Sequence, residues 1–237
     1  MPELAISGLS RATGAGERAA FFDGLNEHAA IATTLELYQS DRLLARAMER
    51  SYPPFRRDGG LDFWVWRDEL ELMASEGMQH VSTTLLLPGQ PTKVYKTTGF
   101  LVDSGRVEIE HVAETDSLSS TDNDGNLQAH QTDLTTLAEL AERARTDGSG
   151  EKNEVNINDL RMDALRGLFT VDAAAPRLTA CATRQHLAAQ GYGSLPLFVY
   201  DQKHGSLQPW VPSSDEVHAL LQQITSPAVQ AHFAASL

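Results

Sequence analysis

The chain has 237 residues, of which 41% are hydrophobic and 22% charged, so its composition is that of an ordinary globular protein and excludes a wholly disordered chain. Asp and Glu number 32 against 19 Lys and Arg, which gives a formal net charge of -13. Nucleic acids and anionic membranes are bound by basic surfaces, so we expect neither as a partner; a basic protein or a small molecule suits this charge better.

The N-terminus carries neither the cationic start nor the apolar core of a cleaved secretory signal. Residues 1–20 are instead small and polar, rich in Ser, Gly and Ala, and predict a flexible tail. No apolar run approaches the length that spans a bilayer. We therefore expect a tail over 1–20 and a single domain over 21–237.

The first third of this domain is predicted to begin with a helix. Apolar residues recur at helical spacing over 27–50, and the two prolines at 53 and 54 end the pattern. The aromatic and β-branched run Leu61–Arg67 predicts a strand, and Asp68–Ser75 predicts a short helix that ends near Gly77.

Three strands are predicted next, over Gln79–Leu87, Lys93–Asp103 and Arg106–Ala113. Only Ser104 and Gly105 separate the last two, which predicts a tight hairpin. The polar segment 114–133 predicts a long surface loop, and loops of this length are usually functional or mobile.

The second half alternates between helices and short strands. Leucines and alanines over 134–144 predict a helix, and Glu154–Asn158 predicts a strand with Val155 and Ile157 on its core face. Glu154 is then expected on the opposite face with Asn156, with its carboxylate exposed. The remaining predicted elements are a strand over Leu165–Val171, a helix over Leu178–Gln190, a hairpin formed by Leu195–Tyr200 and Leu207–Val211, and a last helix capped by Ser213 and Glu216. This order predicts an α+β fold with a mixed, largely antiparallel sheet and flanking helices.

One ordered set of polar residues points to chemistry. Arg67 ends an early strand, Thr97 and Thr98 lie in Tyr95-Lys-Thr-Thr-Gly-Phe100, and Glu154 opens a later strand. In this order the residues resemble the arginine–serine–glutamate type of mono-ADP-ribosyltransferase toxins. The resemblance implies an ADP-ribosyltransferase-like fold and NAD as substrate.

The resemblance also implies a role for each residue. Arg67 would hold the dinucleotide phosphates, Thr98 with Thr97 would shape the nicotinamide pocket, and Glu154 would act on the ribose. Phe100 and Asn156 would join the binding site. These roles fit the chemistry, because a guanidinium binds a pyrophosphate in bidentate fashion and a carboxylate stabilises the positive charge that builds up on the ribose.

A narrower likeness involves the runs that begin at Thr98, His111, Asn153 and Gly167. They resemble bacterial effectors that ADP-ribosylate a threonine of ubiquitin. This resemblance implies a virulence protein that a bacterium secretes into the host cytoplasm without a cleaved signal, and a host protein, ubiquitin among the candidates, as acceptor. We expect a monomer without a metal.

The sequence departs from the family pattern in two places, and two other functions stay open. Lys-Thr-Thr replaces Ser-Thr-Ser, and Glu151 precedes Glu154 by one residue too many for a Glu-x-Glu pair, which makes a hydroxyl acceptor more plausible than arginine. Glu108 and Glu110 form a second candidate pair on one face of a strand, and we expect them to be solvated surface residues.

The alternative functions are a non-enzymatic acidic module that blocks a basic host partner, and a hydrolase that uses Cys181 with His186. The spacing of these two residues along a helix argues against the hydrolase.

Overall fold

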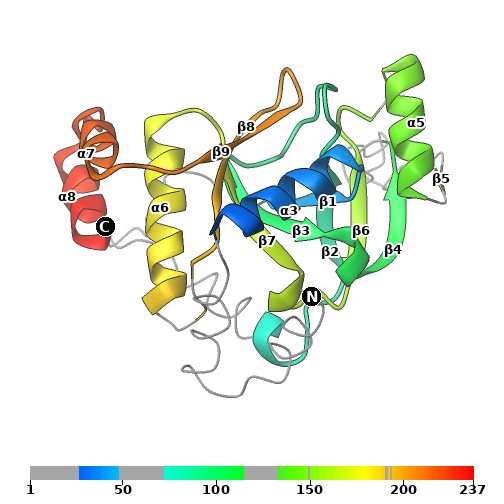
Figure 1. The fold of residues 1–237 in the computed structure, drawn as a ribbon, viewed down its shortest axis with the longest axis horizontal. Coiled ribbons are helices and arrows are strands. Elements are labelled where there is room, and N and C mark those ends of the chain that lie inside the picture. Colours follow the sequence, from blue (N-terminus) through cyan, green and yellow to red (C-terminus); the bar gives the residue numbers. More distant parts are fainter. Residues whose placement is uncertain are drawn as a thin grey trace, which may run out of the picture.

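The computed structural model describes residues 27–47, 72–114, 133–134, 136–148, 150–189, 192 and 194–237. Nine strands within these ranges form one sheet in the order β5-β4-β6-β2-β1-β3-β7-β8-β9. Every neighbouring pair is antiparallel except β7 and β8. The prediction of an α+β fold with a mixed, largely antiparallel sheet is therefore confirmed (Figure 1). The predicted tail at 1–20 and the predicted strand over 61–67 lie outside the described residues.

The helix predicted over 27–50 is wrong in its second half. Helix α3 (Glu27–Gln39) ends at a turn where Asp41 adopts a φ of 56°, and strand β1 (Leu43–Ala47) follows. Strand β1 pairs with β2 on one side and with β3 on the other, and Leu43 and Leu44 are both fully buried. A strand that is buried on both faces shows no polar alternation, so its apolar run was mistaken for the continuation of the helix.

The predicted hairpin at Ser104–Gly105 is also wrong. Strands β2 (Val81–Leu85), β3 (Thr98–Asp103) and β4 (Glu108–Ala113) lie within the predicted ranges, but β3 pairs with β1 and β7, whereas β4 pairs with β5 and β6. A 3₁₀ turn, Ser104–Arg106, connects β3 to β4. The Asp103 carboxylate binds the Gly105 amide at 2.9 Å and the Arg166 guanidinium at 2.9 Å, and so directs the chain from one half of the sheet to the other.

Most of the remaining elements lie within or close to the predicted ranges, although strand β5 was not predicted. They are β5 (Asp133–Leu134), α5 (Leu137–Asp147), β6 (Glu154–Asn158), a 3₁₀ turn (Met162–Ala164), β7 (Leu165–Thr170), α6 (Ala174–Ala189), β8 (Leu197–Asp201), β9 (Ser206–Trp210), α7 (Ser214–Gln222) and α8 (Pro227–Ser236). The hydroxyl of Ser213 caps α7 by accepting a hydrogen bond from the amide of Glu216, as predicted. Helix α8 was not predicted. None of the helices in the described ranges is long and apolar enough to cross a bilayer.

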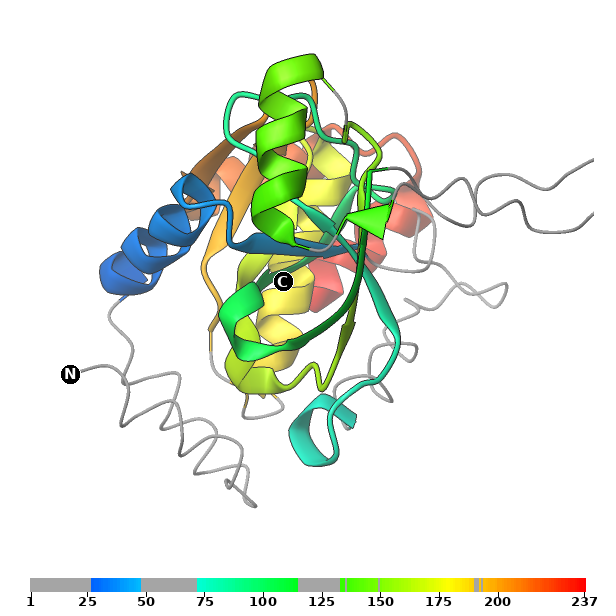
Figure 2. The same ribbon diagram turned by 90° about the vertical axis from the view of Figure 1, so that its right-hand side faces the viewer.

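Two apolar clusters hold the sheet and its helices together. The larger cluster joins α5 and α6 to the face of the sheet that carries Leu44, Val155 and Ile157. The smaller cluster joins α3 to the face that carries Leu43 and Leu101. Helices α6, α7 and α8 lie together at one side, and α5 stands beside β4 and β5 (Figures 1 and 2). Helix α3 contacts β1, β7 and β9, so it covers only one half of its face.

We predict that Gly99→Ala destabilises the protein because β1 and β3 approach each other closely at this residue. A Cβ atom at position 99 would clash with the carbonyl oxygen of Arg46 and lie 2.6 Å from the ring of Phe169. We expect the free energy of unfolding to fall by about 2–3 kcal/mol in chemical denaturation. Gly148→Ala is the control: it has a φ of 73° but nothing within 4 Å, so only backbone strain of about 1 kcal/mol is expected. Equal losses in the two variants would contradict the close approach.

Candidate functional site

A buried glutamate bound by a hydroxyl group lies near the middle of the sheet. The Ser82 hydroxyl on β2 donates a hydrogen bond of 2.8 Å to Oε1 of Glu154 on β6. Glu154 is only 3% exposed. A buried carboxylate is costly unless hydrogen bonds compensate for its lost hydration, so this contact both stabilises and orients the carboxylate.

An arginine from the other side of β2 reaches the same serine. Arg46 on β1 is 9% exposed, and its Nη1 donates a hydrogen bond of 3.3 Å to the carbonyl oxygen of Ser82. Strand β2 lies between β1 and β6 in the sheet. Ser82 therefore contacts the arginine through its backbone and the glutamate through its side chain, and it connects a cation to an anion across three strands.

Two asparagine side chains fix β6 against β2 at both ends. Asn153 is fully buried; its Oδ1 accepts from the Leu85 amide at 2.7 Å, and its Nδ2 donates to the carbonyl oxygens of Leu85 at 3.1 Å and Gly150 at 2.8 Å. At the opposite end, Oδ1 of Asn158 accepts from the His80 amide at 2.8 Å. Asn153 immediately precedes Glu154, the first residue of β6, so its three hydrogen bonds fix the start of this strand and with it the position of Glu154.

The segment Ser82-Thr83-Thr84 supplies a further link between the strands. The Thr83 hydroxyl donates a hydrogen bond of 2.7 Å to the carbonyl oxygen of Val155. Thr83 pairs with Val155, and Ser82 pairs with Asn156, which is half-buried. Side-chain hydroxyls on β2 thus bind β6 on both faces of the sheet, which limits the movement of Glu154.

The residues predicted from the sequence lie in several places. Glu154 and Asn156 lie on β6, and Phe100, 1% exposed, pairs with Arg46. Thr98 pairs with Thr170 on β7 at the start of β3. Strands β1 and β2 separate β3 from β6, a distance of roughly 14 Å across the sheet, so the structure does not bring Thr98 to Glu154.

Of the two remaining predicted residues, only Thr97 lies in the described part of the chain. Thr97 is half-buried in the segment before β3, where its carbonyl oxygen accepts a hydrogen bond from the Val171 amide. Arg67 lies outside the described residues.

Glu154 faces away from the core residues Val155 and Ile157, as expected, but the expectation that its carboxylate is exposed is wrong. The alternation of β6 correctly places the side chain on the opposite face from the core. On that face its neighbours in the sheet are Ser82 on β2 and Ala113, which lies directly opposite on β4. Glu108 and Glu110, the second candidate pair, are both exposed.

Arg46 and Ser82 were missed at the level of the sequence. Arg46 stands in Leu-Leu-Ala-Arg-Ala, whose composition favours a helix. Ser82-Thr83-Thr84 does carry a signal, because it is a run of three hydroxyl residues in a predicted strand and matches the family's Ser-Thr-Ser better than Lys-Thr-Thr does. Thr97 and Thr98 lie 30 and 31 residues after Arg67, whereas Ser82 lies only 15 residues after it, so the choice of strand followed the spacing expected for the family.

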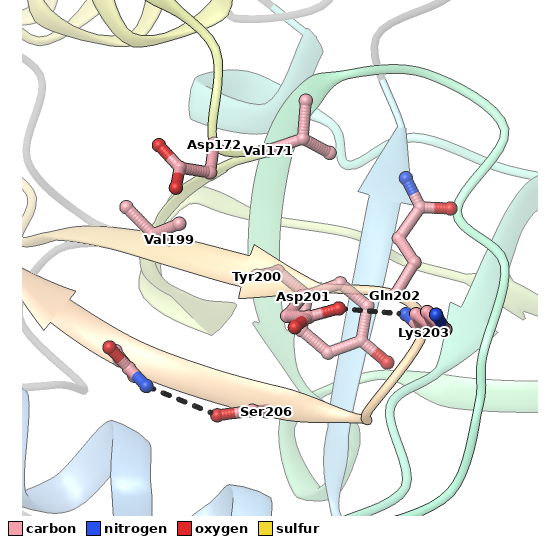
Figure 3. Close-up of a pocket in the computed structure, with 9 residues that line it drawn as sticks. Val171, Asp172, Val199, Tyr200, Asp201, Gln202, Lys203 and Ser206 are labelled. Atoms are coloured by element: carbon pink, nitrogen blue, oxygen red, sulfur yellow. Dashed lines mark hydrogen bonds between the residues drawn. The ribbon is translucent and has the colours of Figure 1, made fainter.

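A separate open pocket of about 490 Å³ lies at the other end of the sheet. It is lined by Val171 and Asp172 after β7, and by residues of the β8–β9 hairpin (Figure 3). In the hairpin turn, a hydrogen bond from the His204 ring lowers the pKa of Asp201. Among the described residues, none of those predicted from the sequence to bind or react lines this pocket.

Cys181 lies on α6 and is 5% exposed. Burial raises the pKa of its thiol to about 11, so the thiolate needed for nucleophilic attack is scarce at neutral pH. His186, on the same helix, has a pKa lowered by burial. These properties favour a packing role for Cys181 over the hydrolase alternative. In the described ranges no three His, Cys, Asp or Glu side chains are grouped so as to hold a metal ion.

We predict that Asn153→Ala lowers stability and disturbs the position of Glu154. The substitution removes three hydrogen bonds and leaves buried polar groups of Leu85 unpaired, at a cost of about 3 kcal/mol. Chemical denaturation measures the loss. Lys152→Ala, at an exposed neighbouring residue, is the control and should change the free energy of unfolding by less than about 0.5 kcal/mol. If both variants unfold alike, Asn153 does not fix the start of β6.

No protein-family model matches this chain, and no curated protein matches it significantly in sequence. A function can therefore be argued only from the residues and their arrangement.

Proposed function

We propose that this protein is an NAD-dependent mono-ADP-ribosyltransferase. The observation that carries the proposal is the contact of 2.8 Å between the Ser82 hydroxyl and Glu154, with the Arg46 guanidinium bound to the carbonyl of the same serine. An arginine on an early strand, a serine–threonine strand and a glutamate are the three elements of the toxin family that the sequence resembles. On this proposal Arg46 takes the role first assigned to Arg67, and Ser82-Thr83-Thr84 takes that of Thr97 and Thr98.

The donor set suits a dinucleotide. A guanidinium offers several N–H donors in a fixed plane and binds phosphate oxygens well. A carboxylate accepts hydrogen bonds from ribose hydroxyls and stabilises positive charge on the sugar. Phe100 pairs with Arg46 and belongs to the larger apolar cluster, on the face of the sheet that carries Val155. The substrate supplies a cationic nicotinamide that leaves as a neutral molecule.

The residues divide this work. Glu154 orients the ribose and stabilises the charge that develops as the glycosidic bond weakens, because its fixed negative charge needs no reorganisation at that moment. Ser82 positions the carboxylate, and Asn153 positions the strand. Arg46 binds the phosphates. Asn156, paired with Ser82 on the same face as Glu154, completes the polar lining.

The sequence around Glu154 also bears on the acceptor. Lys152 stands two residues before Glu154, where a Glu-x-Glu pair would place its first glutamate. The arginine-modifying members of the family use that first glutamate, so a hydroxyl side chain is the better acceptor for this chain. We propose a host protein as the target of a bacterially secreted effector, with a threonine of ubiquitin as the first acceptor to test. An acceptor with a basic surface would complement the net charge of -13.

The rival function is a non-enzymatic module whose acidic surface blocks a basic partner. A labelled-NAD assay distinguishes the two, because a blocking module incorporates no label into lysate protein. Reaction with a lysate that contains free ubiquitin is the appropriate test. Absence of any labelled protein would reject the transferase proposal.

We predict that Glu154→Gln abolishes most transfer but preserves the fold. Glutamine has almost the same shape, and its Oε1 still accepts from Ser82, so thermal stability should change little. The lost negative charge should reduce the transfer rate by on the order of 10²-fold or more. The rate is measured as label incorporated from NAD. Glu108→Gln, at an exposed carboxylate on β4, should keep the wild-type rate; the reverse pattern would place the chemistry on β4.

We also predict that Arg46→Ala weakens NAD binding by roughly tenfold or more, because charged hydrogen bonds to phosphate contribute about 1.5–3 kcal/mol. Arg46→Lys should recover only part of the affinity, since an ammonium cannot bind in bidentate fashion. Calorimetry with NAD checks both variants, and thermal unfolding confirms that each is folded. Arg67→Ala is the informative comparison. A loss of affinity in Arg67→Ala, together with normal binding by Arg46→Ala, would return the phosphate role to Arg67.

A further inference from the structure

A histidine and a glutamate form a pair on the same three strands that hold Glu154. Nδ1 of His80, just before β2, lies 3.0 Å from Oε2 of Glu110 on β4. Both side chains are accessible, with 76% of His80 and 40% of Glu110 exposed. Most exposed ion pairs contribute little to stability, so a gain in stability does not account for the unusual backbone geometry at both residues.

The backbone of His80 is held in an unfavourable conformation. Its φ is 53°, a left-handed value that non-glycine residues seldom adopt. The side chain of Asn158 binds the His80 amide at 2.8 Å and holds this conformation in place. Strained residues of this kind persist where the surrounding structure enforces them, and they cluster at functional sites.

An irregularity in β4 places the partner. The register between β4 and β6 shifts between Ile109 and His111, so Glu110 is the extra residue of a β-bulge. Bulges redirect side chains and are common beside active sites. The left-handed histidine and the bulged glutamate are independent departures from regular sheet geometry, and both serve the same contact.

The pair lies across β6, the strand that carries Glu154, because β6 runs between β2 and β4. Along β2, His80 lies two residues, roughly 7 Å, before Ser82, whose hydroxyl binds Glu154. The order along these strands is therefore the carboxylate, the serine and then the imidazole.

We propose that His80, oriented by Glu110, is the general base that removes the proton from the acceptor, and that the acceptor is a hydroxyl side chain of a protein. This inference rests on the proposed transferase function. The bond between the ribose C1′ and the nicotinamide nitrogen breaks, and its electron pair leaves with neutral nicotinamide. A bond forms between C1′ and the acceptor oxygen, whose proton passes to Nε2 of His80.

The geometry suits this role. A carboxylate accepts from Nδ1–H, which leaves the lone pair of Nε2 available to take a proton. Glu110 then stabilises the imidazolium, and the exposure of the ring allows the proton to leave to water. A neutral hydroxyl is a weak nucleophile and gains from such a base.

The test is chemical rescue of His80→Ala. Wild-type and variant proteins react with labelled NAD and a eukaryotic cell lysate that contains ubiquitin; the initial rate of label incorporation is measured, and mass spectrometry identifies the modified residue. His80→Ala should lose on the order of 10²-fold in rate. Added imidazole should restore at least a tenth of the wild-type rate, because the space left by the exposed ring is open to solvent. The label should reside on Ser, Thr or Tyr.

His204→Ala is a matched control, since Nδ1 of His204 lies 2.6 Å from Asp201 and the pair is similarly exposed, but it belongs to the β8–β9 hairpin. Its rate should equal that of the wild type. A His80→Ala rate within threefold of wild type overturns the assignment, and so does a loss that imidazole does not restore, which indicates a structural role. If the wild type labels protein and Glu154→Gln does not, either of these outcomes rejects only the role of His80 as the general base and leaves the transferase proposal standing. If wild type labels nothing, the transferase proposal itself fails.

Discussion

The position of β2 between β1 and β6 determines the rest of the candidate site. Antiparallel pairing on both sides of β2 brings an arginine and a glutamate from distant parts of the chain to the two sides of one serine. The Glu154 carboxylate is only 3% exposed, and burial of a carboxylate is costly unless hydrogen bonds replace its hydration; Ser82 supplies such a hydrogen bond. Asn153 and Asn158 then prevent β2 and β6 from slipping past each other. The pairing of β2 with β1 and β6 therefore also fixes the geometry of the candidate site.

The charge of the chain makes the placement of Arg46 important. A protein with a net charge of -13 repels an anionic dinucleotide at long range, although salt screens this repulsion beyond about 8 Å. On the proposed function, binding of NAD therefore has to rely on local cations at short distance. Arg46 is nearly buried, so its charge is screened less by solvent than that of a surface lysine. On the same proposal, the net negative charge that repels the dinucleotide attracts a protein acceptor with a basic surface.

The sequence was sufficient to predict the strand that carries Glu154, because alternation of Val155 and Ile157 with polar residues depends only on local spacing. It could not predict the partner of Glu154. Ser82 is 72 residues away, and the register between two antiparallel strands depends on the whole sheet. Thr98 and Ser82 both lie in predicted strands, and only the strand order shows which of the two lies beside Glu154. Arg46 was hidden because burial on both faces of β1 removed the alternation that marks a strand.

The difference in exposure between Glu154 and His80 supports separate roles for the two residues in the proposed reaction. Glu154 is 3% exposed and bound to Ser82, so a proton taken up by its carboxylate would have no direct route to water and would cancel the charge that stabilises the ribose. A group that accepts a proton in every turnover must also release it. The side chain of His80 is 76% exposed and lies next to a carboxylate, so it can do both without changing the charge at Glu154. When Glu154 stabilises the ribose and His80 transfers the proton, the buried charge of Glu154 stays constant while the charge of the exposed His80 changes.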